Sequence, residues 1–185
     1  MLINLPKQPK ESKDLGLKYR IYLALMTYVD LEKYPKPEKA TIKESVLKEG
    51  KKYNYLDGTV ASLKPNVQPG ENQFKGVPML PVIIEGMSKE SLDYVYQNVG
   101  EDFNIIFERC ADGQKFIMGD PCSGGMKMKY TSIGEQEGGL AGIGLEFTGG
   151  ECSQPLLYYD GEIEVEEDAP PVAGRSVQTK NTPKE

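Results

Sequence analysis

The sequence contains no histidine and no tryptophan. Histidine is the only side chain whose unperturbed pKa lies near neutral pH, so its absence excludes Ser-His-Asp catalysis, Cys-His catalysis and histidine-ligated metal sites. Catalysis by carboxylates or lysine remains open for such a chain. The absence of tryptophan removes a preferred aromatic platform for sugar rings, which counts against a carbohydrate-binding module.

Cysteines and long apolar runs are also scarce. The cysteines are Cys110, Cys122 and Cys152, an odd number without C-x-x-C spacing, so we expect free thiols rather than zinc ligands. No segment approaches the roughly 20 apolar residues of a membrane span, and the apolar part of Met1–Lys7 is too short for a signal peptide. We therefore expect a protein that contacts no membrane and stays in the cytoplasm until it joins a larger assembly.

The formal net charge of the chain is −6. A general nucleic-acid binder needs a basic surface that displaces counterions from phosphates, so this charge argues against specific binding of DNA or RNA. An acidic surface either serves solubility or lets DNA move past without adhering.

No glycine-rich or acidic segment has the residues of a cofactor site. Gly119–Gly125 lacks the Lys-Ser/Thr pair of a phosphate-binding loop, and Gly138–Gly144 does not have the dinucleotide-binding spacing. The acidic run Glu162–Asp168 lacks the spacing and the glycine of a calcium loop. We therefore predict no catalytic residues, no cofactor and no metal, and a protein that is not an enzyme.

A chain of 185 residues is expected to form one domain with flexible ends. Residues 1–16 are rich in Lys, Pro, Gln and Ser and lack periodicity, which predicts an extended N-terminal arm. Residues 17–161 form the predicted β-rich domain. Residues 162–185 begin with an acidic run and continue with Pro, Ser and Thr, which predicts an acidic, flexible C-terminal tail.

Short alternating runs separated by turn residues predict a mainly β domain. The expected strands are Lys18–Val29, Thr41–Leu47, Tyr53–Leu63, Val77–Glu85, Phe103–Cys110, Lys115–Met118, Met126–Ser132, Gly142–Thr148 and Leu156–Asp160. For the first of them, a helix over Leu15–Leu31 is the alternative. The second and third are expected to pair as a hairpin around Gly50, and Asp112-Gly113 to join another. Pro78 and Pro81 predict that the fourth is an edge strand.

One amphipathic helix is predicted over Lys89–Asn98, with Ser88 as its N-cap and Gly100 after its C-terminal end. Its expected apolar face consists of Leu92, Val95, Tyr96 and Val99. A single short helix among many strands predicts a β-sandwich or half-barrel that the helix flanks.

Two segments are candidates for contacts between subunits. Pro65–Gly76 reads as a loop by composition, and long ordered loops are often functional or held by a partner. Met126, Met128 and Tyr130 alternate with polar residues and form either a core face or an intersubunit face, since Met and aromatics are enriched at interfaces. The candidate assembly residues are Gln68, Glu71, Asn72, Gln73, Phe74, Met126, Met128 and Tyr130.

The order of these elements carries a resemblance. A proline break at Tyr34-Pro35 follows the first strand, and the helix precedes a strand pair. Gly119, a proline and a glycine-marked loop then lead to the ending Phe-Thr-Gly-Gly…Pro-Leu-Leu-Tyr-Tyr-Asp-Gly. From Lys18 to Gly161 the sequence resembles the small tail-tube-like virion proteins that phages and prophages of Bacteroidetes-type bacteria encode.

The resemblance implies a structural virion protein, either a tail-tube or a neck or connector ring subunit, that is synthesised in the host bacterial cytoplasm. It implies rings, usually sixfold, in which copies of the chain contact each other and other virion proteins. The rings stack around a channel through which DNA passes without specific binding. The alternatives are a monomeric β-sandwich that binds a protein or carbohydrate partner, and an enzyme with a buried carboxylate pair.

Overall fold

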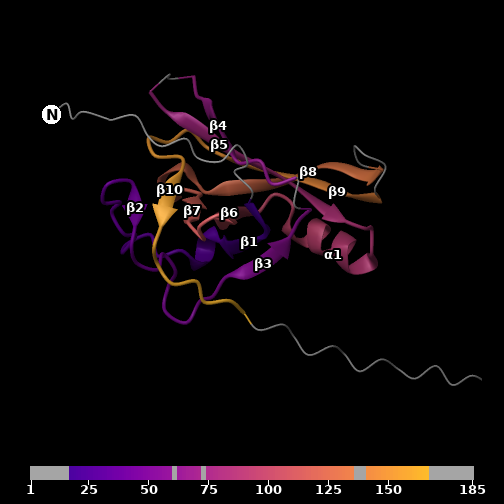
Figure 1. Ribbon diagram of the computed structural model, residues 1–185, viewed down its shortest axis with the longest axis horizontal. Helices are drawn as coiled ribbons and strands as arrows, with labels where there is room; N and C mark the ends of the chain where they lie inside the picture. Colours follow the sequence, from indigo (N-terminus) through magenta and orange to yellow (C-terminus); the bar gives the residue numbers. More distant parts are fainter. Residues whose placement is uncertain (1–16, 60–61, 72–73, 136–140, 167–185) are drawn as a thin grey trace, which may run out of the picture.

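A computed structural model describes residues 17–59, 62–71, 74–135 and 141–166 of the chain. The predicted N-terminal arm and most of the predicted C-terminal tail therefore lie outside the described residues. The fold is mainly β, with ten strands in one mixed sheet and one α-helix (Figure 1). The strands are β1 (Leu17–Leu25), β2 (Thr41–Ile42), β3 (Asn54–Asp57), β4 (Asn66–Pro69), β5 (Gly76–Glu85), β6 (Asp102–Arg109), β7 (Lys115–Met118), β8 (Met126–Glu135), β9 (Ala141–Gly149) and β10 (Leu157–Tyr159).

Strand β6 is the branch point of the sheet. One edge of β6 pairs with β1, and the other pairs with β7 and, at its first residues, with β8. From β7 the sheet continues through β10 to β2, and from β8 it continues through β9 and β5 to β4. All of these pairings are antiparallel except the one between β10 and β2, which is parallel.

The segment after β3 connects the β1 side of the sheet to β5. Gly58 N donates to Tyr19 O and Thr59 N donates to Ile83 O, both at 2.8 Å. Ile83 N in turn donates to Ser62 Oγ at 3.0 Å. These bonds join β1 and β5, which lie far apart in the sheet order. The sheet therefore curls around the larger of its two apolar clusters, to which both strands contribute residues.

Two apolar clusters lie on opposite sides of β6 and β1, because successive side chains of a strand point to opposite faces. The larger cluster contains Ile105 and Phe107 of β6, the inward residues of β5, β8 and β9, and Val95 of the helix. The smaller cluster contains Ile106, Ile117, Tyr53, Tyr159 and Ile42.

Asn104 is fully buried and lies on the same face of β6 as Ile106, on the side of the smaller cluster. Its side chain accepts a hydrogen bond from the Tyr53 hydroxyl at 3.2 Å and donates to the carbonyls of Met118 and Gly119 at 3.3 and 3.1 Å. A buried amide must be paired to offset its desolvation, and this one is paired at both ends.

The helix α1 (Lys89–Asn98) has the predicted bounds. Ser88 is its N-cap, because its side chain accepts from Ser91 N at 3.1 Å, and Gly100 takes a φ of 88° after the last turn. The apolar face is partly different from the prediction. Val95 is buried and Leu92 and Tyr94 pack against the larger cluster, whereas Tyr96 is 60% exposed.

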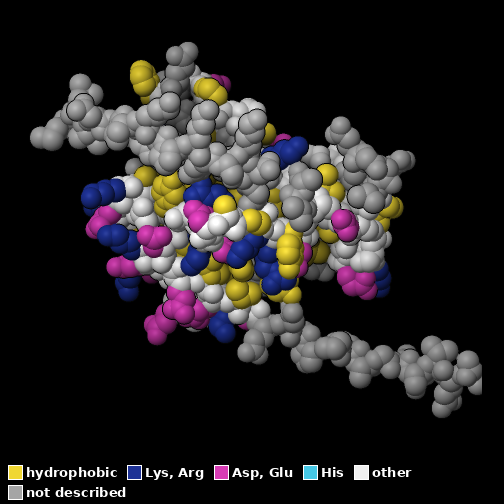
Figure 2. Space-filling view, in the orientation of Figure 1, with side chains coloured by type: hydrophobic (Ala, Val, Ile, Leu, Met, Phe, Trp, Pro, Cys, Tyr) yellow, Lys and Arg dark blue, Asp and Glu magenta, His cyan; other side chains and the backbone are white. Residues whose placement is uncertain are grey.

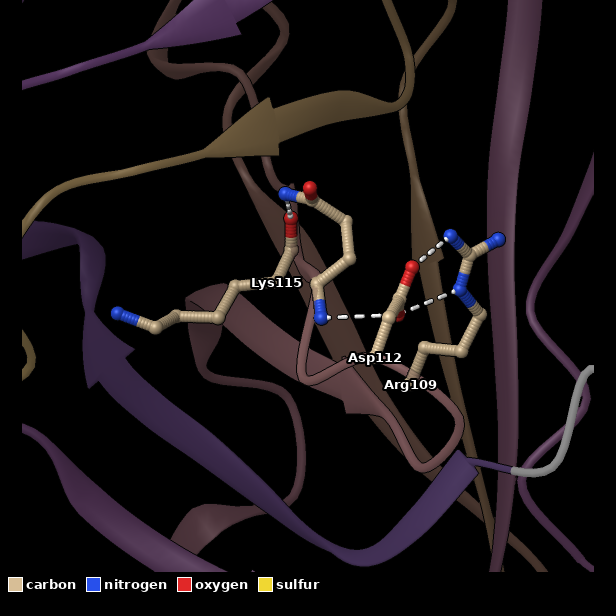
Figure 3. Close-up of polar contacts among 4 residues, drawn as sticks. Arg109, Asp112 and Lys115 are labelled. Carbon is tan, nitrogen blue, oxygen red and sulfur yellow. Dashed lines mark hydrogen bonds and ion pairs between the residues drawn. The ribbon is translucent and has the colours of Figure 1, made fainter.

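The predicted hairpin between β6 and β7 is confirmed, and its turn is closed by side chains as well as by backbone (Figure 3). Arg109 Nε and Gln114 N both donate to Asp112 Oδ1, at 2.9 and 3.1 Å. Gly113 has a φ of 71°, a value that glycine adopts without strain. The first predicted strand is confirmed as β1, although it ends at Leu25 and a short 3-10 turn follows over Met26–Tyr28.

The predicted hairpin between Thr41–Leu47 and Tyr53–Leu63 is wrong. Gly50 has the positive φ of a turn, but the segments on either side of it pair with different partners. β2 pairs with β10, and β3 pairs with β1, because each buries its apolar residues against a different core cluster.

Strand β5 is not an edge strand, and the predicted Pro65–Gly76 loop contains β4. β5 pairs with β9 along one edge and with β4 at the start of the other. Ile83 directs its backbone away from β9, and Pro81 faces the same side because backbone groups alternate along a strand. The pairing with β4 does not reach Pro81, because the first residue of β4, Asn66, lies opposite Met79; the missing N–H of Pro81 therefore breaks no bond with β4.

The first five residues of the predicted tail are docked on the domain. Tyr53 N donates to Glu164 O at 2.8 Å, and Glu166 N donates to Tyr53 O at 2.9 Å. Ile163 packs against the smaller cluster, which is what holds this acidic segment in place. Residues 167–185 lie outside the described residues.

Candidate assembly surface

The hairpin of β4 and β5 projects from the body of the domain (Figure 1). Its strands pair in register from Asn66 opposite Met79 to Pro69 opposite Gly76, and Gly70 N donates to Lys75 O at 2.9 Å at the tip. The structure thus converts the first part of the predicted loop into a defined, short-stranded projection.

The tip end of this hairpin is fixed to the segment after β9. Gly76, which pairs with the last residue of β4, exchanges two backbone hydrogen bonds with Cys152, each of 3.0 Å. Glu71 N donates to the carboxylate of Glu151, which also packs against Gly70. These two attachments hold the tip end against the segment that follows β9.

Phe74 lies at the tip with 93% of its surface exposed. The other exposed large apolar residues range from 38% to 61%, so Phe74 stands apart from them. Nearly all of the apolar area of this ring is therefore in contact with water and is available for a partner to cover.

The predicted assembly residues have different surroundings in the structure. Gln68, Glu71 and Phe74 are exposed on the β4–β5 hairpin, while Asn72 and Gln73 lie outside the described residues. Met126 and Met128 are fully buried in the larger cluster, so their side chains belong to the core of the chain. Tyr130 is 52% exposed and lies next to a bulge in β8 between Tyr130 and Ser132.

A pocket of about 780 Å³ lies beside the tip end of the hairpin. Its walls come from the Leu31–Pro37 segment, the Met118–Ser123 turn and the Glu151–Gln154 segment, with Lys75 at the hairpin side. Leu31, Pro35, Pro37, Pro121 and Leu157 supply apolar surface. The volume falls in the range of pockets that enclose a small ligand or a short peptide turn.

Burial and one carboxylate dominate the electrostatics of this pocket. Burial, together with the charge of Asp120, raises the pKa of the Tyr34 phenol well above its usual range. The same two causes raise the pKa of the Cys152 thiol. Both groups are therefore neutral near pH 7, and Cys152 is not an activated nucleophile.

The charged groups of the pocket are unevenly matched. Asp120 accepts a hydrogen bond from Cys122 N at 3.3 Å, and Glu151 accepts one from Glu71 N. Lys36 and Lys75 have no ion-pair partner among residues 17–59, 62–71, 74–135 and 141–166. The pocket thus carries two lysines and two carboxylates, and it has no net charge of either sign from these four side chains.

The sequence did not predict this pocket, because its walls come from three segments that are far apart in the sequence, between Leu31 and Leu157. The sequence indicates a proline break at Tyr34-Pro-Lys-Pro37 and a turn at Gly119–Gly125. No local pattern shows that these two segments face each other in the fold. The sequence did indicate the hairpin tip, through the length and composition of Pro65–Gly76.

No group of three or more Cys, Asp or Glu side chains among the described residues is arranged to hold a metal ion. No described helix combines the length and the apolar character that crossing a membrane requires. Comparison of the chain with protein-family models, curated proteins and solved structures found no match.

Proposed function

We propose that this chain is a structural virion protein of a bacteriophage, a tail-tube or neck or connector ring subunit that assembles with copies of itself around a DNA channel. The observation that carries the proposal is Phe74, an almost fully exposed ring at the tip of a hairpin that is attached to the segment after β9 in two places. A projection of this kind exposes apolar surface that a neighbouring subunit can bury.

The β-sandwich or half-barrel of such subunits provides strand edges that a closed assembly protects. β4 is the last strand of its branch of the sheet and is only four residues long. Exposed edges are a hazard in a monomer, and contact with a neighbour in a ring removes that hazard. The tip and the edge lie on the same projection, so one neighbour can cover both.

The charge of the chain suits passage of DNA rather than binding. A net charge of −6 repels the phosphate backbone at a distance, and DNA can then move through a bore without adhering. On the face drawn in Figure 2, Lys/Arg and Asp/Glu side chains are interspersed with apolar ones, so this face shows no large patch of one sign. The acidic bore that the proposal requires would therefore be formed by another face of the subunit.

The test is the size distribution of the purified full chain by light scattering on a sizing column, with negative-stain imaging of the heaviest fraction. We expect species many times the 20.5 kDa of one chain, with rings or tubes that have a central hole. A 20.5 kDa monomer at every concentration would contradict the proposal.

The pocket favours a second candidate, a monomeric module that binds a protein or carbohydrate partner. A volume of about 780 Å³ with apolar walls and charged groups of both signs is adequate for a short peptide segment or a small polar ligand. A chain that stays monomeric and is stabilised against heat by such a ligand would support this candidate instead.

A further inference from the structure

Two of the three cysteines of the chain line the same pocket. Cys122 belongs to the 3-10 turn Pro121–Ser123, and Cys152 belongs to the segment after β9. The side chain of Cys122 is exposed and that of Cys152 is buried, and both are free thiols. The remaining cysteine, Cys110, lies in the turn between β6 and β7 and does not line the pocket. The fold thus brings together two thiols that are far apart in the sequence.

The walls that carry these two thiols are in direct contact. Gly150 packs so closely against Ser123 that an added Cβ atom would lie 2.7 Å from the Ser123 carbonyl oxygen. The Ser123 side chain also lies within hydrogen-bonding reach of the Cys152 thiol. A disulfide joins Cα atoms about 4.4–6.8 Å apart, a separation typical of chain segments whose backbones touch. Cys122 is the residue next to Ser123, so both thiols belong to parts of the chain that already meet.

We propose that Cys122 and Cys152 form an intramolecular disulfide when the protein meets a small-molecule disulfide such as oxidised glutathione. This pair is a modification site that does not depend on the assembly state of the chain, so it goes beyond the proposed function. A reducing cytoplasm keeps such a pair as thiols, and the bond forms where small-molecule disulfides are in excess.

The reaction consists of two successive thiol–disulfide exchanges. The exposed Cys122 sulfur, as its thiolate, attacks one sulfur of the small disulfide, whose S–S bond breaks so that one small thiol leaves. The Cys152 sulfur then loses its proton to water and attacks the Cys122 sulfur of the mixed disulfide, and the second small thiol leaves. The leaving thiolates take up the protons that the protein releases. The two protein thiols lose two electrons in total, and these electrons reduce the small disulfide to two thiols.

The surroundings of Cys152 control the second exchange. Burial and the charge of Asp120 raise the pKa of its thiol, whereas Lys75 acts in the opposite direction and is outweighed. The nearby Tyr34 phenol is neutral, because its own pKa is raised. The attacking thiolate is therefore scarce near pH 7. The mixed disulfide at Cys122 is expected to accumulate first, and its conversion into the internal disulfide is expected to become faster as pH rises.

The bond ties the turn after β7 to the segment that holds the β4–β5 hairpin. Cys152 already exchanges two backbone hydrogen bonds with Gly76 of β5. The disulfide therefore anchors the residue to which the tip end of the hairpin is bonded. Because the bond closes a loop in the unfolded chain, the thermal midpoint of the oxidised protein is expected to exceed that of the reduced protein by about 5–15 °C.

Peptide mapping of the oxidised full-length chain tests the bond. The C110S chain is incubated with oxidised glutathione, blocked with iodoacetamide and digested with trypsin. Lys127 and Lys129 separate the two remaining cysteines, so trypsin places them on different peptides. We expect mass spectrometry to find these two peptides linked in a chain that runs as a monomer on a non-reducing gel. The link is expected to disappear after reduction with dithiothreitol.

The C122S chain is the matched control. It retains the exposed Cys110 together with the buried Cys152, just as the C110S chain retains the exposed Cys122 together with Cys152. We expect the internal disulfide in C110S and none in C122S, because Cys110 lies outside the pocket. Circular dichroism verifies that both variants are folded.

Three outcomes overturn the inference and leave the proposed function standing. In the first, Cys122 keeps an attached glutathione while Cys152 stays a free thiol even at alkaline pH. In the second, the C110S and C122S chains form internal disulfides to the same extent. In the third, the oxidised C110S chain is linked only between copies. The proposed function is tested separately, by the assembly state of the reduced wild-type protein, and none of these three results changes that outcome.

Discussion

Replacing Phe74 by alanine is expected to weaken assembly and to leave the fold of the single chain unchanged. Because 93% of the ring is exposed in the isolated chain, truncation removes almost no intramolecular packing. We therefore expect the thermal midpoint and the urea midpoint of the monomer to match those of the wild-type chain.

The effect on assembly follows from the area that the ring can lose to a neighbour. Full burial of a phenylalanine side chain contributes about 1.5–3 kcal/mol, and Phe74 retains nearly all of that area for a contact between copies. Each copy in a ring gives one tip and receives one, so one such contribution is lost per interface. The dissociation constant of the interface is expected to rise by about 10- to 150-fold.

Sedimentation velocity over a concentration series measures this change. The F74A chain is expected to require about 10- to 150-fold higher concentration for half assembly. Y96A serves as the matched control, because Tyr96 is an exposed aromatic on α1 and does not line the pocket. Equal shifts for both variants, or no shift for F74A, would refute the reasoning, and so would a lower thermal midpoint for F74A.

Three further predictions concern the fold that carries the hairpin. Asn104→Ala removes three buried hydrogen bonds and is expected to lower the free energy of unfolding by about 3 kcal/mol in urea titrations; a loss below about 1 kcal/mol would contradict this. Ser88→Ala removes the N-cap of α1 and is expected to lower the free energy of unfolding by about 1 kcal/mol in the same assay. An unchanged free energy of unfolding would argue against a stabilising role of this cap. Burial raises the pKa of Tyr159 to about 12, so the unfolded chain loses this proton first and stability is expected to fall as pH rises above about 10; a constant urea midpoint from pH 9 to pH 11 would contradict it.

Elements that depend on neighbouring residues were predictable from the sequence. The bounds of α1 follow from Ser88 and Gly100, and the β6–β7 hairpin follows from Asp112-Gly113. In each case the capping or turn residue acts on backbone groups within a few positions, so the sequence window contains both partners.

Pairings between distant segments were not predictable in the same way. The turn at Gly50 is real, but β3 pairs with β1 because Leu56 packs into the larger cluster, and β2 pairs with β10 because Ile42 packs into the smaller one. The partner with which each strand pairs depends on which part of the sheet can bury its apolar residues. The local sequence pattern does not contain this information.

The candidate site shows the same division. The exposed tip was indicated by a long segment rich in Pro, Gly, Asn and Gln, whereas the Met126 and Met128 stripe gave two readings that only burial can separate. Tyr130 shares the spacing of those two residues and is nevertheless half exposed, next to a bulge that shifts the register of β8 with β9. Periodicity reports which residues share a face of a regular strand, but it does not show where a bulge changes that pattern.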